Sequence, residues 1–115
     1  MQNFADRLDQ AIEKKSSCLV VGLDPVLERL PGEVLAGAGV PAQGEPGWTA
    51  RAASATGLFL RGVIDSVAPH AVAVKPNAGF FERFGAVGMD CLREVSEHAA
   101  KQGLLVICDA KRGDI

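Results

Sequence analysis

Apolar positions along the chain follow two periods, one typical of helices and one typical of buried strands. Phe4, Leu8 and Ile12 recur at every fourth position and predict an amphipathic first helix. Asn3 is placed to cap its start. Residues 18–23, CLVVGL, form a short continuous apolar run instead. Such a run is typical of a strand that is buried on both faces of a parallel sheet.

Two further helices are predicted after this first strand. Residues 49–67 form one and residues 85–101 the other, and Gly103 is expected to end the second. The inward face of each helix follows from the spacing of its apolar side chains. For the first of these helices the face is Ala52, Phe59, Val63 and Val67, and for the second it is Cys91, Leu92, Val95 and Ala99.

Two more apolar runs are predicted as strands. Residues 71–75, AVAVK, stop at Pro76, and residues 104–108 precede the charged sequence DAKRGDI. After the first strand, residues 31–47 contain five glycines and three prolines, and so many breakers favour an irregular insertion. The order is therefore one helix followed by βαβαβ, within a single domain that takes in residues 1–115.

This alternation predicts an α/β fold with a parallel sheet, either doubly wound or a barrel. The glycine patterns that bind nucleotides in doubly wound folds, GxGxxG and GxxxxGK[ST], are absent from the sequence. The barrel is therefore preferred: a (β/α)8 TIM barrel, of which the chain covers the N-terminal helix and strands one to three. Because a complete barrel takes about 250 residues, the chain is expected to be the N-terminal part of a longer protein.

Composition narrows the classes of function. The 115 residues hold 12 Lys and Arg against 14 Asp and Glu, so no overall basic field attracts nucleic acid or an anionic membrane. No apolar stretch approaches the roughly 20 residues of a membrane span, and the acidic start is unlike a signal peptide. A cytoplasmic protein is expected. Cys18, Cys91 and Cys108 lack paired spacing and are expected to be buried thiols, so no disulfide framework or zinc site is expected. His70 and His98 lie far apart in the sequence, so no histidine metal site is expected either.

Charged residues follow each predicted strand. Asp24 follows the first, Lys75 ends the second, and Asp109 and Lys111 follow the third. Ligands of parallel α/β folds bind at the carboxyl ends of the strands, so these side chains are expected at one face. Each also has a plainer interpretation: Asp24 as a turn residue, Lys75 as a surface residue at the start of a loop, and the last two as a surface ion pair.

The sequence DAKRGD offers more than a single charge. Asp109 and Lys111 are expected to point the same way, roughly 6 to 7 Å apart, if the chain is extended there. Gly113 then permits a turn that redirects Asp114. An ammonium group held between carboxylates is one way in which a site keeps a lysine protonated as an acid.

Three short sequences together resemble the orotidine 5'-phosphate decarboxylase family. They are VVGLDP at the end of the first strand, AVKPN at the end of the second and DAKRGDI after the third. The family pattern is D-x-K-x-x-D with a lysine one strand earlier. Related phosphosugar decarboxylases and aldolases share it, but the Arg112–Gly113 pair together with GLDP and KPN favours the decarboxylase. The resemblance covers residues 4–115, and the long insertion looks like that of the mycobacterial-type branch.

The resemblance implies a cofactor-free and metal-free decarboxylation of orotidine 5'-phosphate to UMP in pyrimidine biosynthesis. It implies that Asp24 binds a ribose hydroxyl. Lys75, Asp109, Lys111 and Asp114 would form a charged tetrad in which Lys111 stabilises and then protonates the carbanion at C6 of the pyrimidine. The family also implies a homodimer in which Asp114 reaches the site of the neighbouring subunit.

The family's phosphate-binding arginine and phosphate-gripping loop have no counterpart in these residues, so the segment alone is expected to be inactive. Two alternatives stay open. One is a metal-dependent phosphosugar decarboxylase or aldolase of the same superfamily, and the other is a non-catalytic half-barrel that acts only by association. Decarboxylation that survives EDTA separates the cofactor-free enzyme from the first alternative.

Overall fold

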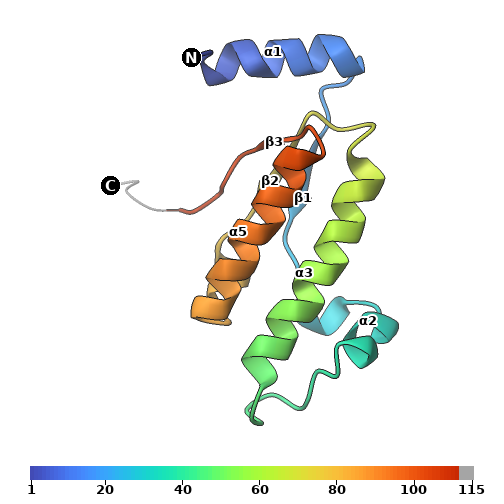
Figure 1. Ribbon diagram of the computed structural model, residues 1–115, viewed down its shortest axis with the longest axis vertical. Helices are drawn as coiled ribbons and strands as arrows, with labels where there is room; N and C mark the ends of the chain where they lie inside the picture. The colour runs from blue at the N-terminus through green and yellow to red at the C-terminus, as the bar shows by residue number, and fades with distance from the viewer. Residues whose placement is uncertain (112–115) are drawn as a thin grey trace.

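Helices and parallel strands alternate along the chain in the computed structural model, which describes residues 1–111 (Figure 1). Strands β1 (Val20–Leu23), β2 (Ala73–Pro76) and β3 (Leu105–Val106) form one parallel sheet in the order β1-β2-β3. The crossover helices α3 (Trp48–Val67) and α5 (Ala86–Lys101) lie side by side on one face of this sheet. Successive βα units of a (β/α)8 barrel have this arrangement, and the predicted order of elements is confirmed.

Helix α1 (Phe4–Lys15) lies across the amino ends of the strands (Figure 1). Its predicted cap is confirmed, because the Asn3 side-chain oxygen accepts a hydrogen bond from the backbone amide of Asp6 at 2.9 Å. Three of its apolar side chains pack against a small cluster at the start of β2 and β3: Leu8, Ala11 and Ile12. Phe4 was predicted on the same face but is 45% exposed.

The main core lies between the sheet and the two crossover helices. The face predicted for α5 is confirmed, and Gly103 ends this helix with a φ of 81°. The face predicted for α3 is confirmed in part. Ala52 is fully buried, whereas Phe59, Val63 and Val67 are partly buried and pack against the edge of the core. These three side chains also line a groove with Val34 of α2. The residues that α3 buries are Ala52, Ala53, Ala55, Thr56, Gly57, Leu60 and Ile64.

The insertion after β1 is more regular than predicted. A 3-10 turn, η1 (Leu27–Arg29), comes before it, and helix α2 (Gly32–Gly37) lies inside it. Leu27 and Leu30 are buried in the main core. The glycines and prolines limit α2 to six residues without abolishing it, since Pro31 occupies the N-cap position, where its missing N–H is not needed.

A further short helix, α4 (Gly79–Glu82), follows β2 and was not predicted. Its Phe81 is fully buried. Helix α5 approaches so closely that a Cβ added at Gly88 would lie 1.8 Å from the carbonyl oxygen of Phe81. A side chain at position 88 would therefore force α4 and α5 apart. This contact fixes the loop after β2 against the helical layer.

The strands are shorter and less covered than the sequence predicted. β1 lies at the edge of the described sheet, and Val20 is 41% exposed, so burial of this strand on both faces is wrong for residues 1–111. Pro76, which was expected to stop β2, is its last residue. Burial of all three cysteines is also wrong. Cys91 is buried in the core, whereas Cys18 and Cys108 flank the strands and are exposed.

Candidate active site

Backbone hydrogen bonds align the residues that follow the strands. The Asn77 amide donates to the Leu23 carbonyl at 3.2 Å, and the Asp109 amide donates to the Pro76 carbonyl at 2.9 Å. The Ala78 amide in turn donates to the Asp109 carbonyl at 3.1 Å. The carboxyl ends of β1, β2 and β3 are thus held at one level, although β3 itself is short.

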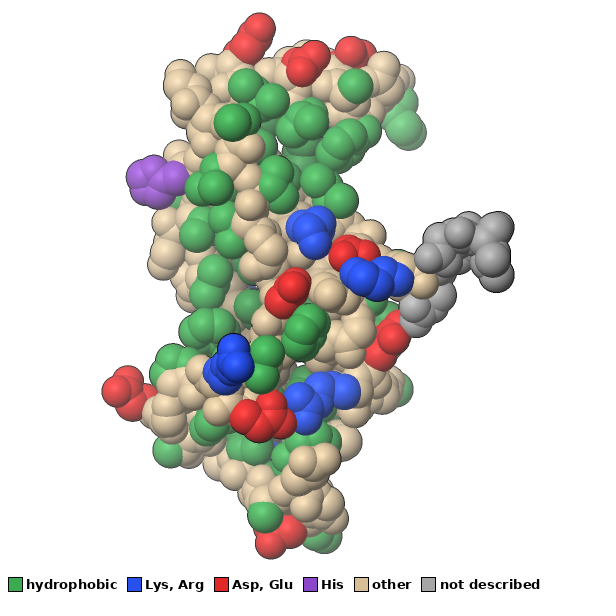
Figure 2. Space-filling view, turned by 180° about the vertical axis from the view of Figure 1, so that it is seen from behind, with side chains coloured by type: hydrophobic (Ala, Val, Ile, Leu, Met, Phe, Trp, Pro, Cys, Tyr) green, Lys and Arg blue, Asp and Glu red, His purple; other side chains and the backbone are tan. Residues whose placement is uncertain are grey.

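The alternation of side chains along a strand decides which of them share a face. Lys75 is paired with Gly22 of β1, and Asn77 forms a bridge with Asp109. Lys75, Asn77 and Asp109 therefore point to one face of the sheet. Val74 points to the other face and lies in the core beneath the helices. On the side of the molecule turned away from α3 and α5, charged side chains of both signs gather (Figure 2).

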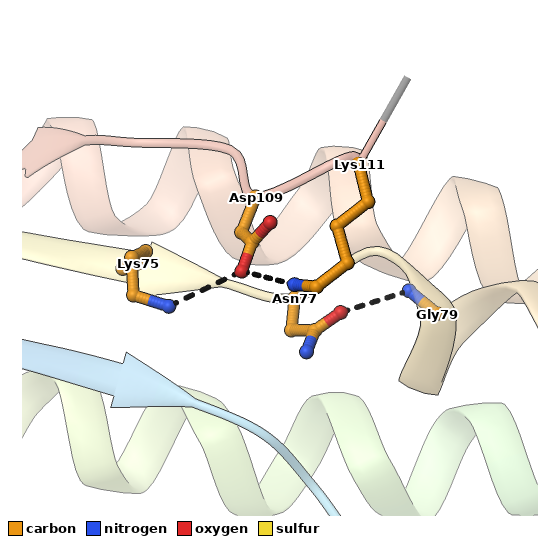
Figure 3. A network of polar contacts seen from close by, with 5 residues as sticks. All are labelled: Lys75, Asn77, Gly79, Asp109 and Lys111. Carbon is orange, nitrogen blue, oxygen red and sulfur yellow. Dashed lines mark hydrogen bonds and ion pairs between the residues drawn. The ribbon is translucent and has the colours of Figure 1, made fainter. Parts of the chain in front are cut away.

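One carboxylate lies between two ammonium groups at this face (Figure 3). The Nζ atom of Lys75 is 3.4 Å from Oδ2 of Asp109, and Nζ of Lys111 donates a hydrogen bond to the same oxygen. The prediction that Asp109 and Lys111 share a face is confirmed. The chain does not stay extended, however, because Lys111 has a φ of 52° in the left-handed region.

The two lysines lower the pKa of the Asp109 carboxyl group below its ordinary value. The hydrogen bond from Lys111 is the larger cause, partial desolvation opposes it, and Lys75 adds a smaller effect in the same direction. Asp109 is therefore ionised at neutral pH. Within this group of three side chains, positive charge exceeds negative charge, which favours an anionic ligand or an anionic transition state.

Of the two other predicted site residues, the structure describes Asp24 but not Asp114. Asp24 directly follows β1 and is exposed. A Cβ added at Gly22, across from Lys75, would lie 3.9 Å from Oδ1 of Asp24, so this carboxylate is close to the face that carries Lys75. Asp114 lies outside the described residues. Its place in the tetrad stays a prediction.

Asn77 belongs to the same face but was not predicted as a site residue. Its side chain lies beside the charged cluster, and its Oδ1 accepts a hydrogen bond from the Gly79 amide at 3.3 Å (Figure 3). That bond shapes the turn into α4. The signal was present in AVKPN, because Asn77 stands two positions after Lys75 and an extended chain places both on one side.

The described residues form neither a cluster of metal ligands nor a helix that could span a membrane. Residues 1–111 contain no group of three His, Cys, Asp or Glu side chains that could hold a metal ion. His98 lies beside Asp65, with 2.6 Å between Nε2 and Oδ1, and His70 is exposed. Over the same residues, no helix has the length and apolar character to cross a membrane.

The chain is similar to known proteins over its whole length. It is 41% identical to an orotidine 5'-phosphate decarboxylase of Rhodopirellula baltica over 115 residues, which are all of this chain and 36% of that protein. It is 38% identical to the enzyme of the same name from Halobacterium salinarum, with 98% of this chain and 36% of that protein covered. No protein-family model matches the sequence.

The fold is similar as well. A solved structure of Leishmania donovani OMP decarboxylase matches with a TM-score of 0.69 and 34% identity, covering 99% of this chain and 35% of that one. The predicted fold class is therefore confirmed: the chain forms part of a TIM barrel and spans about a third of the length of these relatives. The similarities do not separate the branches of the relatives, so the mycobacterial-type assignment stays a prediction.

Proposed function

Because sequence and fold both relate the chain to the orotidine 5'-phosphate decarboxylase family, we propose that this protein converts orotidine 5'-phosphate to UMP in pyrimidine biosynthesis. One observation carries the proposal beyond the resemblance. The Asp109 carboxylate lies between the ammonium groups of Lys75 and Lys111 at the carboxyl ends of β2 and β3. In TIM barrels this end of the strands carries the chemistry.

Lys111 is the general acid of the proposed mechanism. When the bond between C6 and the orotate carboxylate breaks, its electron pair stays on C6 and CO₂ leaves. The Lys111 ammonium stabilises this carbanion and then transfers a proton from Nζ to C6. Its hydrogen bond to Asp109 orients the ammonium before the reaction begins, so little reorganisation is needed as charge develops. The lysine supplies both charge and proton, which is why the mechanism uses no cofactor.

Asp109 has two functions in this proposal. It orients both lysines, and it places a negative charge beside the departing carboxylate of the substrate. The lowered pKa supports the second function, because the group stays ionised at neutral pH. Crowding of like charges strains the bound substrate, but the preorganised ammonium of Lys111 makes the larger contribution to the rate.

The remaining roles follow from the family. We assign to Asp24 a hydrogen bond with a ribose hydroxyl, which its exposed position after β1 permits. We assign Asp114 to the neighbouring subunit's site in a homodimer, as the fourth member of the tetrad. We assign residues 1–115 to a single barrel domain with an insertion at about 31–47. A cytoplasmic location and the absence of nucleic-acid binding stay predictions from the sequence.

Release of CO₂ from orotidine 5'-phosphate by the purified full-length protein tests the proposal, with and without EDTA. Turnover that EDTA leaves unchanged is the expected result. Activity that disappears in EDTA and returns with a divalent cation favours the metal-dependent phosphosugar enzymes instead. A protein that forms stable oligomers but neither turns over the substrate nor binds UMP supports the non-catalytic alternative.

A further inference from the structure

A group of four residues outside the charged cluster forms contacts that the proposed reaction does not use. Arg83 donates two hydrogen bonds to the Glu28 carboxylate, from Nη2 to Oε1 at 2.9 Å and from Nη1 to Oε2 at 3.3 Å. The same guanidinium lies 5.7 Å from the ring centroid of Trp48 and 5.3 Å from that of Phe84. The two rings meet edge to face at 5.6 Å. We call these four residues the Arg83 clasp.

The clasp joins the loops that follow β1 and β2. Glu28 lies in η1, four residues after Asp24, and Arg83 directly follows α4, six residues after Asn77. Trp48 begins α3 at the end of the insertion. Because both loops leave the carboxyl ends of their strands, the clasp connects the two backbone segments that carry candidate substrate-binding groups.

The geometry of the clasp is more restrictive than that of an ordinary surface ion pair. Exposed pairs of flexible side chains contribute little to stability. Here the two parallel hydrogen bonds of a bidentate pair fix the direction of both groups, and the aromatic rings confine the guanidinium further. Each loop is also anchored in the core beside the clasp, since Leu27 and Phe81 are buried. The clasp therefore joins two loops that are each also held by the core.

The two halves of the candidate site depend on the clasp to different degrees. β2 and the residues after β3 are joined by the Asp109 amide, by the Ala78 amide and by the ion pair of Asp109 with Lys75. Asp24 lies beyond the last paired residue of β1, Leu23, and is exposed. Pro25 and Leu27 after it are buried, so the core holds the loop at these two residues and Arg83 holds it at Glu28.

We propose that Arg83 is a positioning residue that sets the place of Asp24 relative to Lys75 and thereby the affinity for the substrate. This inference rests on the proposed function, in which Asp24 binds the ribose and Lys75 lies at the reacting centre. Loss of the clasp weakens the binding of the substrate sugar. The chemical step changes less, because Lys75, Asp109 and Lys111 are held together without the clasp.

Steady-state kinetics of the full-length protein test this role with Arg83→Met. Arg93→Met is the matched control, because Arg93 is also ion-paired on the surface but belongs to α5 and has no aromatic partner in residues 1–111. For Arg83→Met we expect the KM for orotidine 5'-phosphate to rise about tenfold and kcat to change less than about threefold. Arg93→Met is expected to change neither.

Two variants separate positioning from a general loss of structure. Arg83→Lys keeps the charge but not the two-pronged geometry, so its KM should lie between those of wild type and Arg83→Met. The double reversal Glu28→Arg with Arg83→Glu should lower KM relative to either single reversal. Trp48 is the single tryptophan of these 115 residues, and its fluorescence should change in Arg83→Met and stay unchanged in Arg93→Met.

The outcomes distinguish this inference from the function on which it rests. An active wild type, combined with an Arg83→Met variant that loses thermal stability but keeps its KM, shows a purely structural clasp and overturns the inference alone. A fall in kcat at unchanged KM also overturns it. If the wild type neither turns over orotidine 5'-phosphate nor binds UMP, the proposed function and the positioning role are both wrong.

Discussion

Lysine ammonium groups lie at both ends of the sheet, but their partners differ. At the amino end, Lys15 of α1 donates to the backbone carbonyls of Ala68 at 2.9 Å and Ala71 at 2.7 Å, and Gly103 lies at 3.4 Å. These carbonyls belong to the ends of α3 and α5 and to the turns that follow them. Carbonyl groups at helix ends lack hydrogen-bond partners within the helix and carry partial negative charge. Lys15 supplies hydrogen bonds to these carbonyls and thereby connects α1 with the ends of α3 and α5.

At the carboxyl end the partner is a side chain instead. Lys75 and Lys111 share the single carboxylate of Asp109, on a face that no described helix covers. The first arrangement provides hydrogen bonds to backbone carbonyls of the fold. The second places two ammonium groups on one carboxylate. We infer that Lys15 stabilises the fold at the amino end, whereas Lys75 and Lys111 serve the proposed site at the carboxyl end, the end of the strands that carries the active sites of TIM barrels.

The sharpest test of the comparison is removal of Lys111. In the full-length enzyme, Lys111→Ala should lower kcat by about 100-fold or more and change KM little, because a positioned acid acts mainly in the transition state. Steady-state CO₂ release measures both constants. Lys101→Ala, at the exposed end of α5, is the control and should behave as wild type. A Lys111→Ala enzyme that keeps more than about a tenth of the wild-type kcat contradicts the assigned role.

A second large effect is expected from the shared site. Asp114→Ala and Lys111→Ala proteins should each be inactive, but a mixture should recover activity through hybrid dimers that carry one intact site. After equal mixing and complete exchange, about a quarter of the wild-type activity is expected in a two-fold symmetric dimer. Native mass spectrometry verifies the exchange. If hybrid dimers form and stay inactive, Asp114 acts in its own subunit.

The two crossover helices show how far a hydrophobic period can predict burial. α5 has one apolar stripe, so the burial of Val95 followed from the sequence. α3 has apolar residues on neighbouring faces, and Phe59 with Val63 fits a helical period as well as Leu60 with Ile64 does. Leu60 and Ile64 are the pair that is fully buried in the main core. The spacing alone could not decide between the two faces, because it does not say where the sheet lies.

The candidate site was predictable for a related reason. Parallel strands end at one edge, so Lys75 and Asp109 could be placed together from their positions after predicted strands. The contact between Glu28 and Arg83 could not be predicted. It joins two residues 55 positions apart in the sequence, one in η1 and one directly after α4. Both of these helices are too short to produce a helical period in the sequence.

A moderate effect, on stability alone, is expected at the amino end. Lys15→Met should lower the free energy of unfolding by about 1–3 kcal/mol, because charge-assisted hydrogen bonds to backbone carbonyls are lost. Urea titration measures this change. Lys14→Met is the matched control, since Lys14 is the neighbour of Lys15 on α1 and is exposed. kcat and KM of folded Lys15→Met should equal those of wild type, and a fall in kcat would show that the two ends of the sheet are not separate in function.

The smallest effect concerns the titration of Asp109. Its pKa in the folded protein lies below the ordinary value of 3.8, mainly through Lys111 and less through Lys75. A carboxyl group whose pKa is lowered by folding stabilises the protein above its ordinary pKa, and that contribution is lost as pH falls through the lowered value. The charge of Asp109 is therefore constant above about pH 5, and the activity should show no acid limb from this group at higher pH.

Carbon-13 NMR of labelled aspartate side chains, assigned with Asp109→Asn, can measure this pKa in variants of the two lysines. Lys111→Met removes the larger cause and should raise the pKa of Asp109 more than Lys75→Met does. Both should bring it closer to the ordinary value, because a neighbouring cation favours the ionised carboxylate. An Asp109 pKa that is equal in all three proteins would show that the ammonium groups do not hold this carboxylate in solution. A larger rise in Lys75→Met would make Lys75 its main partner and leave the Lys111 ammonium without the orientation that a general acid requires.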